Sequence, residues 1–302
     1  MAFPELERRT NLSQLEFIRR YLRGNRPVVV SDGARDWKAV GRWTPEYFKE
    51  LLGNEEVNLQ GHYFEVTGRT TFGKYIDSLP TSRQPEVPGA PRVVPYLRWS
   101  DEGGFTDKLF ALVKEDWGRP YFLPSYFYIH PPVLYSDPTR FRYPAAGVYF
   151  SGPGAVTRLH ADSGISNAVV CQVYGHKRCI IIAPDELHLF PDLSTRQPVP
   201  EHLPEHAQSY RGARVMETTI GPGDVLFVPA NWLHEVYTID RSISLTYNFA
   251  HTTEAARYLP FAIHHVGGEQ AQKIPFPGVR KAAQTLLDGY ARIGRALGFE
   301  GL

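Results

Sequence analysis

From residue 146 onward, the chain consists of short apolar runs separated by Gly, Pro and Asp, which is the pattern of β-strands joined by turns. A long polar insertion from about residue 185 to residue 213 interrupts the series. The expected strands lie in AGVYFSG, AVTRLHADS, NAVVCQVYG and KRCIIIAP before the insertion, and in VMETTIGPGD, DVLFVPANWLHEVYTI and RSISLTYNFA after it. This half of the chain is therefore predicted to be mainly β.

The first eighty residues mix helical and strand patterns. Apolar residues recur at helical spacing over 11–24. Thr44 is a natural N-cap and Pro45 suits the first position of a helix, so a second helix is predicted up to Gly53. The other elements expected here are strands over 27–33 and 57–66 and a short helix over 71–79.

Two segments flank the β-rich part. Residues 80–145 are rich in Pro, Tyr and Phe and are predicted to be irregular, with short strands and loops. Residues 278–297 predict an amphipathic helix. The apolar stripe of this helix must be covered by its own domain or by a second copy of the chain, and a homodimer is favoured. The stripe consists of Val279, Ala282, Leu286, Leu287, Tyr290 and Ile293.

Nothing in the chain marks a domain boundary, because it has no internal repeat and no low-complexity linker. One domain over 1–302 is predicted, with an N-terminal flank (1–80), a β core (81–250) and a C-terminal helical segment (251–302). Aromatic residues make up 13% of the chain, and it has 25 Pro and 26 Gly. This composition favours many short strands joined by turns over a helical bundle.

Charge and cysteine content narrow the environment. Lys and Arg (33) nearly cancel Asp and Glu (32), so no overall field favours nucleic acid or a membrane surface. The two cysteines, Cys171 and Cys179, form no disulfide framework, which favours a reducing compartment. The N-terminus lacks a signal-peptide pattern, and no apolar run is long enough to cross a bilayer. A cytoplasmic location is expected, with the nucleus as the alternative.

The candidate chemistry lies in the β-rich part. His160 and Asp162 are two residues apart, so in a strand they point to the same face. A carboxylate on a face that should be core needs a partner, which is either a neighbouring side chain or a cation. His234 follows the turn and strand of GPGDVLFVPANWLHEV. Two imidazoles and one carboxylate suit a facial triad for non-haem Fe(II). The alternative is a chance HxD pair, since the chain has 11 His.

Three segments together resemble the JmjC-type, cupin-like Fe(II)/2-oxoglutarate oxygenases, the family of the asparaginyl hydroxylase that acts on hypoxia-inducible factor. They are EFIRRYLRGNRPVVVSDGARDWKAVGRWTPEYFKELLG, then TRLHAD with GHKRCIIIAPDE, and finally GPGDVLFVPANWLHEV with ISLTYNFA. The resemblance covers most of the chain. It implies a double-stranded β-helix (a jelly-roll or cupin fold) with flanking helices, and iron held by His160, Asp162 and His234.

The resemblance also implies residues for the cosubstrate 2-oxoglutarate. Lys177 in GHKRC fits the cation for its far carboxylate, and Thr157 fits a hydroxyl partner; the alternative for Lys177 is a solvated lysine at a strand edge. Tyr96 and Asn248 resemble pocket residues, although both equally suit structural hydrogen bonds. Asn167 lies one place away from the register of the family's asparagine, which an insertion or bulge in DSGIS would explain.

The implied activity is hydroxylation of a C–H bond with O2, coupled to conversion of 2-oxoglutarate to succinate and CO2. A peptide or protein side chain, or a small amino-acid-like molecule, is the expected substrate. The alternatives are a tRNA-base hydroxylase, a lysine demethylase, a metal-dependent isomerase or dioxygenase without 2-oxoglutarate, and a non-catalytic cupin that binds a ligand. Tyr residues at 121, 126, 128, 135 and 143 either line a substrate groove or pack normally, and packing is favoured.

Overall fold

The computed structural model describes residues 3–61, 65–81, 94–98, 105–124, 127–128, 146–162, 166–190, 210–254, 263, 268 and 270–296. Its strands are β1 (Arg8–Arg9), β2 (Val28–Val30), β3 (Glu56–Gln60), β4 (Val66–Thr71), β5 (Phe127–Tyr128), β6 (Ala146–Ser151), β7 (Val156–His160), β8 (Asn167–Tyr174), β9 (Lys177–Ile182), β10 (Val215–Ile220), β11 (Val225–Val228), β12 (Leu233–Thr238) and β13 (Ser242–His251). Its α-helices are α1 (Gln14–Glu16), α2 (Ala39–Arg42), α3 (Pro45–Leu52), α4 (Phe72–Ser78), α5 (Phe105–Val113) and α7 (Pro277–Ala296). A π-helix covers Phe17–Leu22, and 3-10 helices cover Pro184–Leu189 and Thr252–Glu254.

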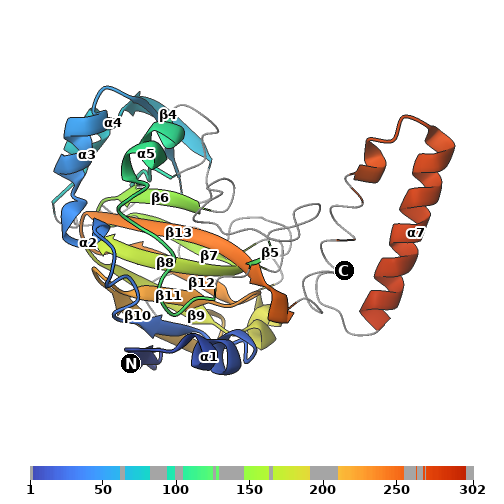
Figure 1. Ribbon diagram of the computed structural model, residues 1–302. Helices are drawn as coiled ribbons and strands as arrows, with labels where there is room; N and C mark the ends of the chain where they lie inside the picture. Colours follow the sequence, from blue (N-terminus) through green and yellow to red (C-terminus); the bar gives the residue numbers. More distant parts are fainter. Residues whose placement is uncertain are drawn as a thin grey trace.

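Two sheets form the core of the molecule (Figure 1). The larger sheet has the strand order β1-β2-β11-β8-β13-β5, with β6 also paired to β13, and the smaller one has the order β10-β9-β12-β7. Every pairing within them is antiparallel except that of β1 with β2. Two facing sheets of this kind are the predicted jelly-roll, which confirms the predicted fold class.

Alternation along the strands sorts the apolar side chains into three layers. The layer between the sheets contains Val170, Cys179, Ile181, Leu226 and Val236. A second layer lies between the larger sheet and the N-terminal helices, and a third covers the outer face of the smaller sheet. The space between the two sheets is therefore where inward-facing polar residues share an apolar, water-poor environment.

The N-terminal segment forms most of the elements that its sequence predicts, and it does more than flank the core. The single strand expected over 57–66 is wrong: β3 ends at Gln60, and β4 begins at Val66 and pairs antiparallel with it. The Thr44 hydroxyl caps α3 by accepting the backbone N–H of Tyr47 at 3.0 Å. The helix expected over 11–24 begins as α1 and continues as the π-helix. The strand expected over 27–33 is β2, which pairs with β11 and so extends the larger sheet.

The described part of 80–145 includes a helix that the sequence did not predict. α5 is a helix within it, because Phe105, Leu109, Phe110 and Val113 are spaced to bury one helical face. The density of aromatic and proline residues around it hid this period. Of the five tyrosines, only Tyr121 has a described side chain: its hydroxyl donates to Asp32 Oδ1 at 2.8 Å and accepts from Leu12 N at 3.0 Å, which is packing. The side chains of Tyr126, Tyr128, Tyr135 and Tyr143 lie outside the described residues, as does 191–209 of the polar insertion.

The C-terminal helix α7 matches the predicted amphipathic helix and lies apart from the sheets in Figure 1. Three apolar side chains of its stripe are exposed: Val279 (57%), Leu286 (75%) and Ile293 (64%).

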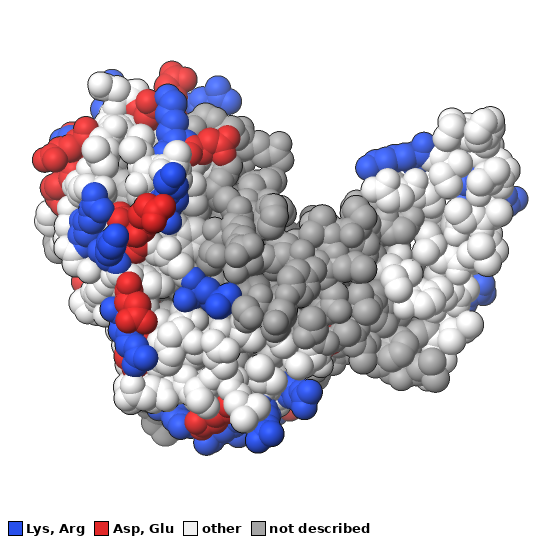
Figure 2. All heavy atoms as spheres, viewed as in Figure 1, with Lys and Arg blue, Asp and Glu red and all other residues white. Residues whose placement is uncertain are grey.

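Figure 2 shows acidic and basic side chains intermixed on the visible face of the core. Among the described residues, no helix combines the length and apolar character needed to cross a membrane.

The turn before Lys177 depends on Gly175, and this gives a first prediction. Gly175 has φ +69°, and a Cβ there would lie 2.0 Å from the carbonyl oxygen of Arg241. Gly212 has φ +79° but nothing within 4 Å of its Cβ position. Gly212→Ala should therefore lower the free energy of unfolding by only about 1–2 kcal/mol, the strain of an alanine at positive φ. Gly175→Ala should lower the free energy of unfolding by at least about 2 kcal/mol more. Urea unfolding measures both, and equal losses would contradict the role given to this contact.

Candidate metal centre and carboxylate pocket

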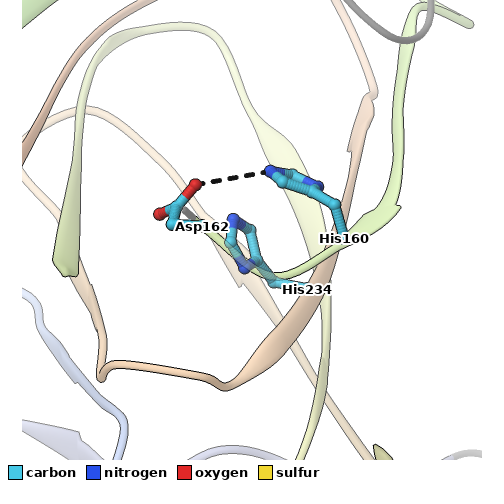
Figure 3. A group of neighbouring side chains, drawn as sticks. All are labelled: His160, Asp162 and His234. Carbon is cyan, nitrogen blue, oxygen red and sulfur yellow. Dashed lines mark ion pairs between the residues drawn. The ribbon is translucent and has the colours of Figure 1, made fainter. Parts of the chain in front are cut away.

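Three side chains converge between the sheets: His160 at the end of β7, Asp162 just after it, and His234 on β12 (Figure 3). One ligand atom from each lies within 4.8 Å of the others. The His160 Nε2 and Asp162 Oδ1 atoms are 3.6 Å apart, and the two imidazole centroids are 4.1 Å apart. His234 is buried, while His160 and Asp162 are partly exposed, so the group is closed on one side and accessible on the other.

Strand pairing brings the two histidines together. β12 lies between β7 and β9, and His234 is the register partner of His160. The pairing of β12 with β7 then shifts by one, because Val236 pairs with Thr157. This is a β-bulge, in which one residue of β12 stands opposite two of β7. Thr157 and His160 are three apart and would face opposite sides of a regular strand, but the bulge lets both face the space between the sheets.

Backbone carbonyls orient both imidazoles. His160 Nδ1 lies 2.7 Å from the carbonyl oxygen of Arg158, and His234 Nδ1 lies 3.2 Å from that of Trp232. A carbonyl only accepts, so each Nδ1 carries the proton and each Nε2 keeps its lone pair. Burial, and then the neighbouring His234, lower the pKa of His160, which favours the neutral ring that a metal needs.

Asp162 is held by an amide from the other sheet. Asn248 on β13 donates through Nδ2 to Asp162 Oδ2 at 2.8 Å, which leaves Oδ1, the oxygen nearer His160, for another partner. The same amide lies 3.3 Å from the hydroxyl of Ser166. Asn248 therefore contacts a member of the triad, in a position to orient its carboxylate.

These residues fit an iron ion. Two neutral imidazoles and one carboxylate form the ligand set of non-haem Fe(II) sites, and outer partners fix each of the three. Three protein ligands on one side leave coordination positions for small molecules on the other. Among the described residues, this is the one group of His, Cys, Asp and Glu side chains close enough to share an ion.

Lys177 begins β9 and lies buried between the same two sheets, 3% exposed. Its Nζ donates to the hydroxyl of Ser244 on β13 at 2.9 Å, and no described carboxylate lies within ion-pair distance. Burial lowers its pKa. Lys177 is therefore a buried lysine rather than a solvated one at a strand edge, and its role toward a cosubstrate stays a prediction. A buried ammonium whose described partner is a hydroxyl favours an anionic ligand.

Hydroxyl groups surround this lysine. Tyr96 is 1% exposed, its ring centroid lies 5.5 Å from Lys177 Nζ, and its hydroxyl is 3.1 Å from the Oγ1 of Thr238. The Ser151 and Thr238 hydroxyls are 2.9 Å apart. Burial raises the pKa of Tyr96, but Lys177 and Arg98 outweigh it and the net shift is downward. This group of polar residues takes the name carboxylate pocket from the ligand proposed for it below, and it comprises Tyr96, Arg98, Ser151, Thr157, Lys177, Thr238 and Ser244.

Arg98 is the charged pocket residue that the sequence did not single out, and the hydroxyl residues Ser151, Thr238 and Ser244 were not singled out either. Arg98 is 4% exposed, and its guanidinium donates to the Thr157 hydroxyl at 3.0 Å and to the carbonyl of Gly61. It follows Tyr96 by two residues, which was the available signal, because residues two apart in an extended segment share a face.

Asn167 does not join either group. Its Nδ2 donates to Glu254 Oε2 at 2.7 Å and to the carbonyl of Phe249 at 3.2 Å, and its Oδ1 accepts from Ala230 N at 3.0 Å. The amide is therefore used within the protein. Ser166, just before β8, is instead the neighbouring residue whose hydroxyl contacts Asn248.

Comparison with known proteins agrees with this geometry. The model of a family described as the cupin-like domain matches residues 13–255. The chain belongs to that family. The match includes every strand of both sheets except β1, and all three triad residues, and it confirms the resemblance to JmjC-type oxygenases.

Curated relatives point to iron and 2-oxoglutarate. The arginine-specific demethylase JMJ20 of Arabidopsis thaliana is 27% identical over 79% of this chain and 55% of its own length. The JmjC domain-containing protein A of Dictyostelium discoideum is 25% identical over 75% of this chain and 88% of its own. The 2-oxoglutarate and iron-dependent oxygenase JMJD4 of Danio rerio is 22% identical over 78% and 57%. The chain thus spans little more than half the length of two of these relatives.

The contact between Asn248 and Asp162 gives a second prediction. Loss of an outer partner of a metal ligand typically weakens metal binding by about 10–100-fold. Asn248→Ala should therefore raise the Kd for Mn(II), used as an air-stable probe in calorimetry, by that factor. Thr246→Val, on the same face of β13, is the matched control and should change it less than about twofold. Equal effects would show that β13, rather than this amide, supports the site.

Proposed function

We propose that this cupin-like protein is an Fe(II)- and 2-oxoglutarate-dependent hydroxylase. It would oxidise a C–H bond of a peptide or protein side chain, or of a small amino-acid-like molecule, and release succinate and CO2. The observation that carries the proposal is Lys177: a buried cation, bonded to a hydroxyl, in the same inter-sheet space as a His–Asp–His group. Metal chemistry alone does not require that cation, whereas a dicarboxylate keto acid does.

The residues divide the work between two ends of one pocket. His160, Asp162 and His234 would hold the iron, which supplies the redox chemistry that couples O2 to the keto acid and the substrate. Lys177 and Thr157 would bind the far carboxylate and so orient the keto acid toward the triad. The apolar layer between the sheets, including Val170 and Val236, keeps water from the space between these ends.

The substrate class is supported by chemistry and charge. Relatives include an enzyme named as an arginine-specific demethylase, and removal of an N-methyl group begins with the same C–H hydroxylation. The formal net charge is +1, and acidic and basic side chains are intermixed on the face in Figure 2. A nucleic-acid substrate would favour a basic surface, so we place a protein or amino-acid-like substrate before a tRNA base.

Succinate formation tests the proposal. The Fe(II)-loaded protein is incubated in air with 2-oxoglutarate, beside His160→Ala, Lys177→Ala and the control Lys108→Ala, an exposed lysine paired with Glu55. We expect slow turnover that His160→Ala abolishes. Lys177→Ala should raise the KM for 2-oxoglutarate by about 10–100-fold, the equivalent of one charged hydrogen bond, and regain turnover at high cosubstrate.

Binding of 2-oxoglutarate is measured in the same samples, because relatives of this kind can stay idle without their substrate. Binding that His160→Ala and Lys177→Ala both weaken supports the proposal even where turnover is below detection. Neither turnover nor binding of 2-oxoglutarate by the wild-type protein would overturn it in favour of a non-catalytic cupin.

We also propose a homodimer through α7, in the cytoplasm. Val279, Leu286 and Ile293 recur every seven residues on α7, a spacing that forms a helix–helix seam. The two free, buried cysteines support a reducing compartment. Light scattering should give twice the chain mass for the wild type and the chain mass for a Leu286→Glu, Ile293→Glu double variant. Thr285→Glu, off the stripe, should remain dimeric, and a monomeric wild type would contradict the proposal.

A further inference from the structure

Arg98 is a second buried cation in the carboxylate pocket. It lies in a short extended segment in which Leu97 pairs with Phe150 of β6, so Tyr96 and Arg98 point to the same side. The Arg98 guanidinium carbon is 4.0 Å from the centroid of the Tyr96 ring, and Lys177 Nζ is 5.5 Å from the same centroid. Both cations therefore lie against one aromatic ring inside the protein.

The direction of the hydrogen bonds in this pocket follows from Arg98. A guanidinium only donates, so the Thr157 hydroxyl must accept from it and keeps its own proton to donate. Thr157 is also hydrogen-bonded to the Tyr96 hydroxyl. With Thr157 donating, Tyr96 accepts, and the Tyr96 proton is directed onward to Thr238 or to a ligand.

Lys177 directs the opposite side of the pocket in the same way. Its ammonium only donates, so the Ser244 hydroxyl accepts from it and keeps a proton to offer. The proton of Thr157 is therefore used on Tyr96, whereas the hydroxyls of Tyr96 and Ser244 each keep a proton that can turn toward a ligand beside the two cations. A ligand that only accepts, such as an ionised carboxylate, satisfies all of these donors at once.

We propose that Arg98 is a positioning residue that makes the pocket selective for a keto acid with a second carboxylate, acting through Thr157 and Tyr96. The inference rests on the proposed function, since it assigns the far carboxylate of 2-oxoglutarate to this pocket. Arg98 contributes positive charge and fixes the direction in which the hydroxyls donate, while Lys177 makes the direct contact.

The test compares two keto acids that share a reactive end. 2-Oxoglutarate carries the far carboxylate, and 2-oxopentanoate has the same chain length without it. Calorimetry of the Mn(II)-loaded protein gives the Kd of each for wild type, Arg98→Met and Arg98→Lys. Arg178→Met is the matched control, because Arg178 follows Lys177 but points out of the barrel to Glu217.

Arg98→Met should raise the Kd for 2-oxoglutarate by about tenfold or more, because a nearby positive charge and the orientation of the Thr157 and Tyr96 hydroxyls are both lost, and should change that for 2-oxopentanoate less than about twofold. Arg98→Lys keeps the charge but loses the paired N–H donors of the guanidinium. Its Kd for 2-oxoglutarate should therefore lie between those of the wild type and Arg98→Met. Arg178→Met should leave both values unchanged.

Two results would overturn the inference. A parallel rise in both Kd values would show that Arg98 only supports the fold, and no rise in either would show that it does not act on the pocket. Where Arg98→Met does not fold, Arg98→Lys carries the same comparison, with a loss confined to 2-oxoglutarate as the supporting result. Failure of the wild type to bind 2-oxoglutarate is a different outcome, which would overturn the proposed function itself.

Discussion

The pairing of β12 with β7 is the constraint on which the site depends. It places His234 directly opposite His160, and the shift in register just beyond them turns Thr157 to the same side of the sheet. A regular pairing would send either His160 or Thr157 to the outer face, where Leu159 packs with Ile180 and Leu233. One extra residue in β7 therefore lets a single strand serve both the metal site and the carboxylate pocket.

The carboxylate pocket lowers the stability of the fold, which indicates that the pocket serves to bind a ligand. Burial of Lys177 and Arg98 takes two charged groups out of water, and both have their pKa lowered by it. Apolar residues of similar size at these positions would normally be neutral or stabilising. Strain of this kind is kept where a ligand relieves it, because binding to the folded state alone adds stability in proportion to ligand concentration.

The sequence predicts much of this arrangement, and its failures have physical causes. The spacing of His160 and Asp162 and the turn before His234 pointed to the triad, and the resemblance singled out Lys177 and Asn248, which contact Ser244 and Asp162 in the structure. The residues that were missed depend on contacts between distant segments.

Arg98 is such a case. It lies in a segment without periodicity, and only the backbone pairing of Leu97 with Phe150 brings it to the pocket. Asn167 was predicted to bind the cosubstrate because of the family resemblance. In the structure its amide bonds to Ala230 and Glu254, which are more than sixty residues away in the chain. A pairing between distant segments and a one-residue bulge both leave no hydrophobic periodicity in the sequence, so neither can be predicted from it.

A single strand sets the span between the two ends of the pocket. Ser244 contacts Lys177 and Asn248 contacts Asp162, and both are inward residues of β13, four positions or roughly 13 Å apart along a strand. β13 pairs with β8 on one side and β6 on the other, so its register is fixed from both edges. The distance between the metal end and the carboxylate end is therefore a property of the sheet rather than of a loop. The loops at the rim can therefore vary with the substrate without changing the spacing of the two ends.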